Sequence, residues 1–199
     1  MLLEQAIELF QRTGVMQEGH FKLTSGQHSN RYMQCAKLFQ YPKESMKVCE
    51  EIAEFFRDKD VDLVAGPAIG GIVMAYEVAR ILCARGAEVR SIFAERENGV
   101  MTLRRGFQVE AGQRALVVED VVTTGGSVKE VIEILRAQGA EIVGVGSVVD
   151  RSQGTVDFPV GGSKIPFYAC AALKVESWDP DACPLCRQGL PIVKPGSRT

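Results

Sequence analysis

Hydrophobic residues recur along the chain with two alternating periods, one typical of helices and one of buried strands. Apolar residues at helical spacing, such as Leu3, Ile7 and Phe10, predict amphipathic helices over residues 2–13 and 43–57. Further along, short β-rich apolar runs alternate with helical segments. The expected strands are 61–65, 89–93, 115–118 and 142–149, and the expected helices are 72–83 and 127–137.

This alternation predicts the fold class. Strands separated by helices of about a dozen residues pair in parallel through right-handed crossovers. The run 116–118 is apolar on both faces, as in a strand that helices cover on both sides. We therefore expect an α/β fold, an open, mostly parallel, twisted sheet with helices on both faces. The Gly161-Gly162 turn within 161–173 indicates an additional hairpin or edge strand.

The chain reads as one domain, residues 1–199, with 46% hydrophobic residues and no internal repeat or low-complexity linker. The alternating pattern marks a core of about residues 41–160. The flanking segments, about 1–40 and 161–199, fall outside the pattern, so we expect them to pack together as a small cap over the sheet.

Net charge and hydropathy limit the classes of partner that the protein is expected to bind. Twenty-three basic and 25 acidic residues give a net charge of -2, which is a poor match to a protein that grips a nucleic-acid backbone. No window approaches the ~18 apolar residues of a membrane span, and no secretory pattern stands at the start. We expect a cytoplasmic protein whose partners are small molecules, with neither nucleic acid nor membrane among them.

Cysteine and histidine positions give little sign of a metal site. In the cytosol the six cysteines are expected as free thiols. Cys183 and Cys186 have metal-ligand spacing, but no second pair and no downstream histidine completes a zinc site. His20 and His28 have no cysteine or carboxylate cluster around them in the sequence. An ordinary C-terminal turn is thus the favoured interpretation of 183–186, and a histidine-metal active site is not expected.

The strongest chemical pattern is Val-Val-Glu-Asp-Val-Val-Thr-Thr-Gly-Gly-Ser at residues 117–127. A buried strand ends in two acids and passes through a loop of hydroxyls and glycines into a helix, an arrangement that suits a phosphate. Acids beside a phosphate repel it unless they hold hydroxyls or a cation, and ribose diols and Mg²⁺ fit both needs. The alternative is a plain helix cap by Thr124 or Ser127, which would not require Glu119 and Asp120.

Two further loops follow expected strands. Residues 65–71, Ala-Gly-Pro-Ala-Ile-Gly-Gly, permit close backbone approach to an anion, although such a loop is often only a tight connection. Residues 95–107 form a polar, glycine-containing stretch that suits a mobile flap. In open sheets of this type, ligands bind beyond the carboxyl ends of the strands, where both loops are expected.

Residues 117–127 closely resemble the phosphoribosyl pyrophosphate (PRPP) motif of the type I phosphoribosyltransferases, and 65–71 looks like the family's pyrophosphate loop. The resemblance implies that Glu119 and Asp120 contact the ribose hydroxyls and that 123–127 hold the 5-phosphate. With Arg96 of the flap, these two acids are the expected catalytic residues. The full PRPP-binding set implied is Glu119, Asp120, Val121, Val122, Thr123, Thr124, Gly125, Gly126, Ser127, Ala68, Ile69, Gly70, Gly71 and Arg96.

Residues 20–32 are similar to the N-terminal signature of orotate phosphoribosyltransferases, although some relatives carry lysine where Thr24 stands. Orotate is a flat ring with a carboxylate, so it needs a platform and donors aimed at its oxygens. The candidate donor is Arg151, with a surface ion pair as the alternative. The other candidates are Tyr32, for which core packing is the alternative, and Ser25, Gly26 and Thr123.

In this family the flap closes over a neighbouring subunit's active site, which implies a homodimer with shared sites. Arg96, and Arg104 or Arg105, would inherit the contacts to pyrophosphate, with solvated surface arginines as the alternative. Relatives usually carry a catalytic lysine in the flap. None is present between 95 and 107, and Val100 occupies the expected position. The enzyme would then be slow, or an arginine would have taken over.

The implied reaction is orotate plus PRPP giving orotidine 5-phosphate and pyrophosphate. Mg²⁺ is the expected cofactor and is held mainly by PRPP, with no direct protein ligand assigned. Two alternatives remain open, a transferase for uracil or a purine and a non-catalytic PRPP-binding regulator.

Overall fold

A six-stranded sheet forms the centre of the computed structural model, which describes residues 1–23 and 25–195. Thr24 therefore lies outside the described residues. The strand order is β10-β7-β6-β3-β4-β5, and only β5 runs antiparallel to its neighbour. The strands are β3 (Leu63–Pro67), β4 (Arg90–Glu97), β5 (Val100–Leu103), β6 (Arg114–Val122), β7 (Glu141–Asp150) and β10 (Phe167–Ala172). The expected α/β fold class is confirmed.

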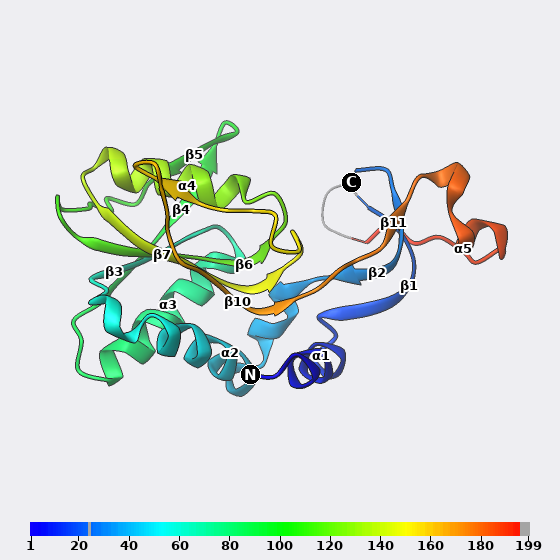
Figure 1. Cartoon of the computed structure of the whole chain (residues 1–199), viewed down its shortest axis with the longest axis horizontal. Helices are drawn as coiled ribbons and strands as arrows, with labels where there is room; N and C mark the ends of the chain where they lie inside the picture. Colours follow the sequence, from blue (N-terminus) through cyan, green and yellow to red (C-terminus); the bar gives the residue numbers. More distant parts are fainter. Residues whose placement is uncertain (24, 196–199) are drawn as a thin grey trace.

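Helices cover both faces of this sheet (Figure 1). Helices α2 (Pro42–Phe55) and α3 (Gly70–Ala84) lie on one face, and α4 (Gly126–Ala137) lies on the other. The central strand β6 supplies both cores, because Leu116 and Val118 pack on one side while Ala115 and Val117 pack on the other. This arrangement explains why the run is apolar at consecutive positions.

Glycines in β7 allow α2 to approach the sheet closely. A Cβ placed on Gly146 would lie 2.6 Å from Ile52, and one on Gly144 would overlap Phe56. Separations this short do not occur between real side chains, so larger residues at either position would push α2 outward. The small residues noted between the valines of this strand are thus a packing requirement.

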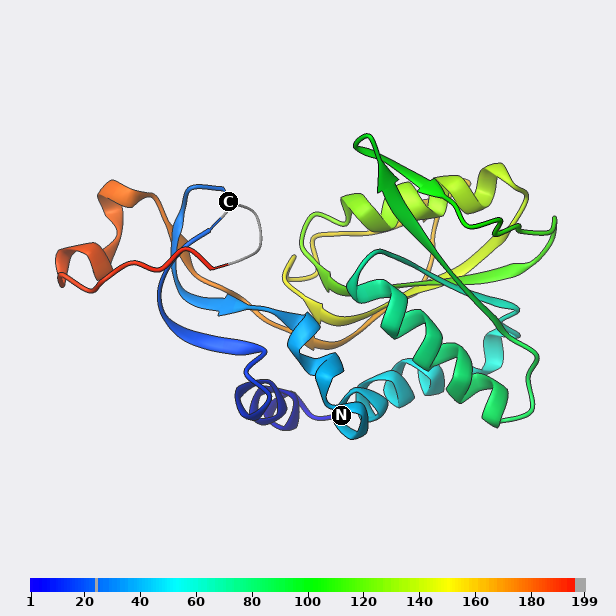
Figure 2. The same ribbon diagram turned by 180° about the vertical axis from the view of Figure 1, so that it is seen from behind.

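The N-terminal and C-terminal segments form a second, smaller sheet, called here the terminal sheet. It contains β1 (Met16–Lys22), β2 (His28–Met33) and β11 (Ser177–Trp178) in the order β1-β2-β11. Figures 1 and 2 show it projecting from one end of the main sheet, beyond α1 (Leu3–Arg12). The short elements α5 (Pro184–Arg187), η1 (Cys35–Gln40), η2 (Arg57–Lys59) and η3 (Pro180–Ala182) complete the chain with the β8–β9 hairpin described next.

Residues 159–172 contain both features expected after Gly161-Gly162. The two glycines join the hairpin strands β8 (Pro159–Val160) and β9 (Ser163–Lys164), and β10 then pairs in parallel with the edge of β7. Since β10 belongs to the main sheet, the described part of the C-terminal segment enters the terminal sheet only beyond residue 172.

The flap differs from the irregular loop that its polar composition suggested. Strand β4 continues to Glu97, and β5 returns antiparallel to it from Val100. Asn98 and Gly99 both have positive φ, 51° and 86°, the pattern of a tight type I′ turn. The Asn-Gly pair was the signal for this hairpin.

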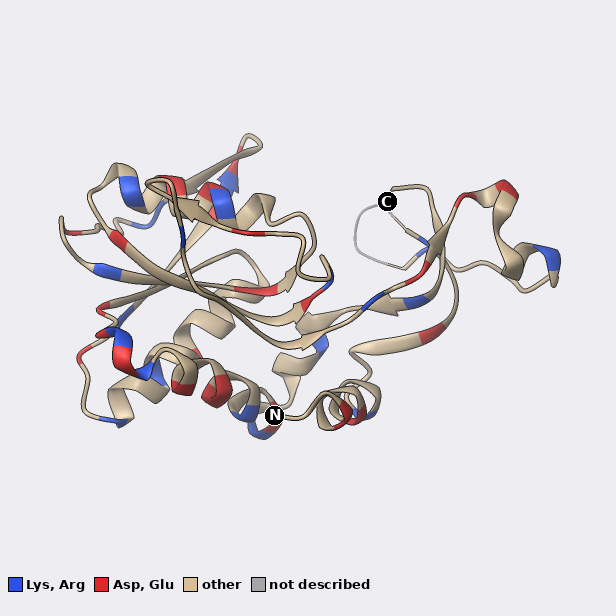
Figure 3. Ribbon diagram, in the orientation of Figure 1, with Lys and Arg blue, Asp and Glu red and all other residues tan. Residues whose placement is uncertain are grey.

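Two global features complete the description. Lysine and arginine are interspersed with acidic residues over the ribbon (Figure 3). Among the described residues, no helix has both the length and the apolar character needed to cross a membrane.

Candidate active site

Two adjacent carboxylates lie at the carboxyl end of β6. Burial raises the pKa of both groups, and the neighbouring charge of Asp120 raises the pKa of Glu119 further. The Asp120 side chain accepts a hydrogen bond of 2.8 Å from the Val121 backbone N–H. Within residues 1–23 and 25–195, neither carboxylate forms an ion pair. Neither group has a cationic partner in the described chain, so both are available to a cation or to ligand hydroxyls.

The loop that follows β6 is shaped around a small hollow of about 70 Å³, lined by Glu119 and residues 121–128. Gly125 is the N-cap of α4, with φ of 73°, and a Cβ there would lie 2.9 Å from Val156 and from Phe158. Glycine is thus required at this position. No side chain of the described residues caps the helix, so the plain-cap alternative is wrong, and the first N–H groups of α4 are available to an anion.

The second glycine loop, 65–71, lies beside the first because β3 and β6 are neighbouring parallel strands. A Cβ on Gly66 would lie 2.6 Å from the carbonyl oxygen of Gly71 and 2.8 Å from that of Val118. A Cβ on Gly70 would overlap the Asp120 carboxylate. Ile69, joined to Ala68 by a cis peptide bond, is 81% exposed at the loop tip. The loop therefore contributes to the same site and is more than a chain connection.

Arg151 follows β7, on the other side of β6. Its backbone N–H donates to the carbonyl of Val122 at 2.8 Å, which ties the residue to the end of β6. The side-chain Nε is buried without a hydrogen-bond partner, and burial lowers the pKa of the guanidinium. No described carboxylate pairs with it, so the surface ion-pair alternative is wrong. An unpaired, half-buried guanidinium is a site for a ligand anion.

Tyr32 and Cys35 lie close enough to Arg151 for their charges to interact. The charge of Arg151 interacts with both residues, and the buried Cys35 thiol also experiences the charges of Glu119 and Asp120. Tyr32 is half-buried, with its ring 5.8 Å from that of Phe21, so it is not a fully packed core residue. The structure thus brings Tyr32 and Arg151 together near the two acids.

Comparison with known proteins decides the family. The model of the phosphoribosyl transferase domain matches residues 36–177, more than half of the chain. The chain belongs to the phosphoribosyltransferase family. The resemblance seen in residues 117–127 is therefore confirmed.

Similar sequences within this family include proteins named orotate phosphoribosyltransferase. The chain is 53% identical over 195 residues to orotate phosphoribosyltransferase of Caldanaerobacter subterraneus subsp. tengcongensis, covering 98% of this chain and 97% of the relative. It is 55% identical over 191 residues to orotate phosphoribosyltransferase of Thermotoga maritima, covering 96% and 97%. The solved orotate phosphoribosyltransferase of Aeropyrum pernix superposes with a TM-score of 0.66 at 22% identity, covering 83% of this chain and 92% of that one, which shows a shared fold.

The three arginines of the phosphoribosyltransferase flap contact other residues of the same chain. Arg96 donates to the carbonyl of Gly99 at 2.7 Å and pairs with Glu130 of α4 at 2.9 Å. Arg105 pairs with Glu95 at 2.9 Å, and Arg104 lies 3.3 Å from Glu97. None of the three is brought to the carboxylates of β6 in this arrangement. Val100 is 66% exposed next to the turn.

Ser25 and Gly26 lie at the tip of the β1–β2 hairpin. The turn closes through hydrogen bonds of 2.9 Å from the Gly26 N–H to Leu23 and 2.8 Å from the Leu23 N–H to Gln27. No hydrogen bond in the described chain joins the tip to Arg151. Their expected contact with the base thus remains a prediction.

Asn30 is a candidate that the sequence interpretation missed. Its side-chain oxygen is buried without a partner, as is the Nε of Arg151. Asn30 and Tyr32 are two residues apart on β2, so their side chains lie on the same face. Alternate residues of a strand face the same side, so the choice of Tyr32 could have added Asn30 to the base-side candidates.

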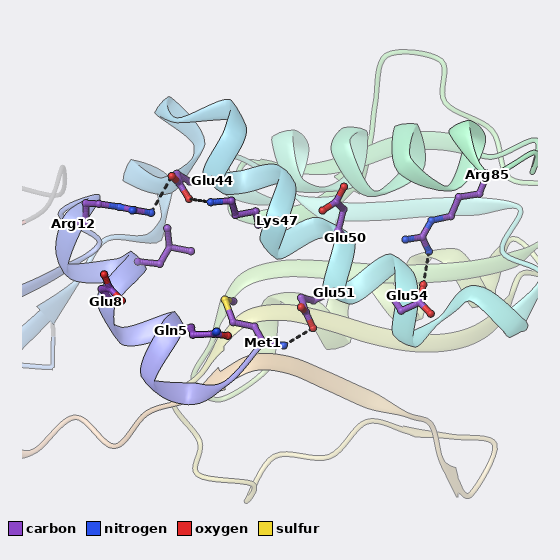
Figure 4. A pocket seen from close by; sticks show the side chains of 11 residues that line it. Met1, Gln5, Glu8, Arg12, Glu44, Lys47, Glu50, Glu51, Glu54 and Arg85 are labelled. Carbon is purple, nitrogen blue, oxygen red and sulfur yellow. Dashed lines mark hydrogen bonds and ion pairs between the residues drawn. The ribbon is translucent and has the colours of Figure 1, made fainter.

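A separate hollow of about 590 Å³ lies between α1 and α2 (Figure 4). Five glutamates line it, three of which form ion pairs there: Glu44 with Arg12 at 2.9 Å, Glu51 with the N-terminal ammonium group at 2.6 Å and Glu54 with Arg85 at 3.0 Å. An acidic lining repels phosphate and carboxylate ligands. The hollow is also away from the carboxyl ends of the strands, so it is not the substrate site.

The histidines and the C-terminal cysteines contradict the sequence expectation. His20 and His28, on β1 and β2, lie beside Cys183 and Cys186, and their four ligand atoms fall within 4.8 Å of one another. The interpretation of 183–186 as an ordinary turn and of the histidines as isolated is therefore wrong. It failed because the two pairs are more than 150 residues apart and only the terminal sheet brings them together.

Proposed function

We propose that this protein transfers the ribose 5-phosphate unit of PRPP to orotate, giving orotidine 5-phosphate and pyrophosphate, a step of pyrimidine nucleotide synthesis. The observation that carries the proposal is the pair of unpaired carboxylates on β6 next to an anion loop, with an unpaired guanidinium on the adjacent strand. The name shared by relatives at more than 50% identity supports orotate as the base.

The loop after β6 suits the 5-phosphate of PRPP. Backbone N–H groups at the start of α4 and the Thr123, Thr124 and Ser127 hydroxyls donate to its oxygens. Glu119 and Asp120 accept hydrogen bonds from the ribose hydroxyls, which compensates their burial. The neighbouring loop 65–71, packed against Asp120 through Gly70, takes the pyrophosphate end.

Arg151 provides the base side of the site. Orotate carries a carboxylate, and a planar guanidinium binds a carboxylate with two parallel hydrogen bonds. The buried Nε of Arg151 would gain the partner that it lacks. Uracil, hypoxanthine and adenine have no carboxylate, so this contact favours orotate over them.

Mg²⁺ fits the site through its acids. The two uncompensated carboxylates on β6 match the oxygen ligands that Mg²⁺ prefers, while PRPP supplies most of its coordination. Bound there, Mg²⁺ would neutralise charge on the pyrophosphate. Glu119 and Asp120 would hold the ion through the sugar hydroxyls or directly.

The chain's own part in the reaction is mainly electrostatic. As the bond from the anomeric carbon to pyrophosphate breaks, positive charge grows on the ribose and negative charge on the leaving group. A ring nitrogen of orotate forms the new bond to that carbon. The two carboxylates fix and stabilise the ribose, the helix terminus holds its phosphate, and closure of the flap hairpin excludes water.

A homodimer accounts for the exposed apolar face of α3. Val73 and Tyr76, three residues apart, are exposed on one side of the start of this helix. Pairing of two chains through this face would cover both residues, and the interface would lie next to loop 65–71. The six free cysteines support a reducing compartment, as in the cytoplasm.

A base panel tests the proposal. PRPP is offered with orotate, uracil, hypoxanthine or adenine, each with and without Mg²⁺, and pyrophosphate release is measured. We expect turnover with orotate that depends on Mg²⁺, and at most a small fraction of it with the other bases. Preference for another base would assign a different transferase. Binding of PRPP without turnover on any base would favour a regulator.

A further inference from the structure

Four side chains in the terminal sheet form a cluster that the transfer reaction does not use. This His–Cys cluster consists of His20, His28, Cys183 and Cys186. Three of the four residues are buried, and Cys183 has no exposed surface. Buried imidazoles and thiols placed together are the typical ligands of zinc.

Distances within the His–Cys cluster match a tetrahedral site. His20 Nε2 lies 3.1 Å from His28 Nδ1, 3.6 Å from Cys183 Sγ and 3.7 Å from Cys186 Sγ. Cys186 Sγ lies 3.2 Å from His28 Nδ1. A tetrahedral Zn²⁺ with nitrogen at about 2.0 Å and sulfur at about 2.3 Å separates its ligand atoms by roughly 3.3 to 3.8 Å. These four separations are close to that range, and all four ligand atoms lie within 4.8 Å of one another.

The second nitrogen of His20 fixes which tautomer is present. His20 Nδ1 lies 2.8 Å from the carbonyl oxygen of Leu190, which can only accept, so Nδ1 carries the proton. Nε2 is then left with its lone pair directed at the two sulfurs and His28. This is the arrangement found around zinc-bound histidines, in which an outer carbonyl orients the ring.

The ligands come from two distant segments that the chain folds together. Cys183 and Cys186 flank the first residues of α5, a Cys-Pro-Leu-Cys turn, while the histidines lie on the β1–β2 hairpin. Backbone contacts between the segments are sparse. Trp178 pairs with His28 on one side, and on the other the Val193 N–H donates to His20 at 2.8 Å.

The terminal sheet has little apolar material to hold its outer part. Leu190, Ile192 and Val193 are all exposed, and Figure 2 shows the α5 segment far from the main sheet. A small unit without its own hydrophobic core usually needs a disulfide or a metal. The cluster occupies the place where that core would be.

We infer that His20, His28, Cys183 and Cys186 bind one structural Zn²⁺ ion, which fastens the C-terminal segment to the β1–β2 hairpin. With two nitrogens and two sulfurs the coordination is complete, so no position is left for a substrate or water. The ion's role is to hold the hairpin that carries Ser25 and Gly26, and it does not take part in the transfer.

Metal analysis of matched variants tests this site. The wild type, Cys186→Ser and Cys83→Ser are purified in reducing buffer without chelator, and zinc is measured by mass spectrometry. Cys83 is an exposed cysteine on α3, outside the cluster, and serves as the control. We expect about one zinc ion per chain in the wild type and in Cys83→Ser, and loss of most of it in Cys186→Ser. Equal zinc in all three, or none in the wild type, overturns the inference.

Cobalt provides a readout that does not depend on a variant folding. Wild-type protein stripped with a chelator is titrated with Co²⁺. Tetrahedral coordination by two thiolates gives intense visible absorption and a near-ultraviolet charge-transfer band, saturating at about one equivalent. Absence of these bands overturns the site. The site is also overturned if the wild type is purified without metal and with Cys183 and Cys186 joined by a disulfide, since the two cysteines would then pair with each other.

Proteolysis tests the fastening role. Arg187 is exposed within the segment that the ion would hold, so trypsin can reach it once the segment detaches. A chelator should speed cleavage after Arg187 at least ~10-fold in the wild type, and added Zn²⁺ should reverse the effect. Cleavage that is equally fast with and without the chelator contradicts the fastening role.

Discussion

Gly70 lies directly against the carboxylate of Asp120, although the two residues belong to different loops. A Cβ on Gly70 would lie 2.6 Å from Asp120 Cγ and closer still to one carboxylate oxygen. Gly70, in loop 65–71, is the first residue of α3, and Asp120 lies near the carboxyl end of β6. The contact joins the proposed pyrophosphate and ribose parts of the site, so a change at either residue affects both.

Gly70→Ala should therefore damage the site despite being a small change. Alanine favours helices by up to about 1 kcal/mol, but forcing a methyl group against Asp120 costs about 1 to 3 kcal/mol. We expect a lower free energy of unfolding and a kcat/KM for PRPP reduced at least ~10-fold, because the carboxylate must move. Urea unfolding and steady-state kinetics measure the two effects.

A double-mutant cycle separates this contact from a general effect on α3. In Asp120→Ala the overlapping atoms are gone, and the remaining Cβ contact is 3.2 Å. Gly70→Ala should then cost almost no stability in the Asp120→Ala background. An unchanged cost in both backgrounds would show that the destabilisation does not come from the carboxylate.

Stability should fall with rising pH because of Glu119. Its folded-state pKa is raised by burial and by Asp120, so the folded protein holds a proton that the unfolded chain releases at lower pH. Between the ordinary carboxyl pKa and the raised one, each pH unit removes up to about 1.4 kcal/mol of stability. Glu119→Gln cannot ionise, so its free energy of unfolding should decline less steeply from pH 5 to pH 8.

Urea unfolding at four pH values tests this slope. Glu18→Gln, at an exposed glutamate of β1, is the matched control for loss of one negative charge. It should keep the wild-type slope. A Glu119→Gln protein with the same slope as wild type would mean that Glu119 is already ionised at the lower pH.

Arg151→Ala should weaken orotate binding more than PRPP binding. The Nε of Arg151 is buried and unpaired, and we place the orotate carboxylate against it. Losing a charge-assisted bond costs about 1.5 to 3 kcal/mol, or roughly 10-fold or more in Kd. Isothermal titration of each substrate gives the comparison. A loss confined to PRPP would assign Arg151 to the other substrate.

Val100→Lys should raise kcat by more than ~10-fold, since one donor to a developing charge is typically worth ~10² to 10³ in rate. The side chain is exposed beside the Asn98-Gly99 turn, so the thermal midpoint should hardly change. The flap arginines pair with glutamates within the chain, which favours the account in which none has replaced the lysine. If kcat stays at the wild-type value, alanine variants of Arg96, Arg104 and Arg105 will identify the residue that supplies the charge.

Patterns within short stretches of sequence predicted the main sheet and the phosphate loop well. The segment 117–127 carries strand, loop and helix start within eleven consecutive residues, so its geometry follows from nearby sequence. The same holds for loop 65–71, although its contact with Asp120 depends on β3 and β6 being neighbours. The Asn98-Gly99 turn was also a local signal, but the polar composition around it concealed the hairpin.

The His–Cys cluster could not be predicted in this way. Its histidines look isolated and its cysteines look incomplete until β11 pairs with β2. The unpaired Nε of Arg151 is a similar case, because only burial reveals that no carboxylate reaches it. Features that depend on pairing between distant segments need the folded chain.

The most direct test of the central claim follows the disappearance of orotate in the presence of PRPP and Mg²⁺, for the wild type and for Asp120→Asn. The Asp120 carboxylate should bond a ribose hydroxyl, and a charge-assisted bond is worth about 1.5 to 3 kcal/mol. The account predicts orotate turnover by the wild type and at least a ~10-fold lower kcat/KM in a folded Asp120→Asn protein. A wild type that consumes no orotate, or an Asp120→Asn protein as active as the wild type, would contradict it.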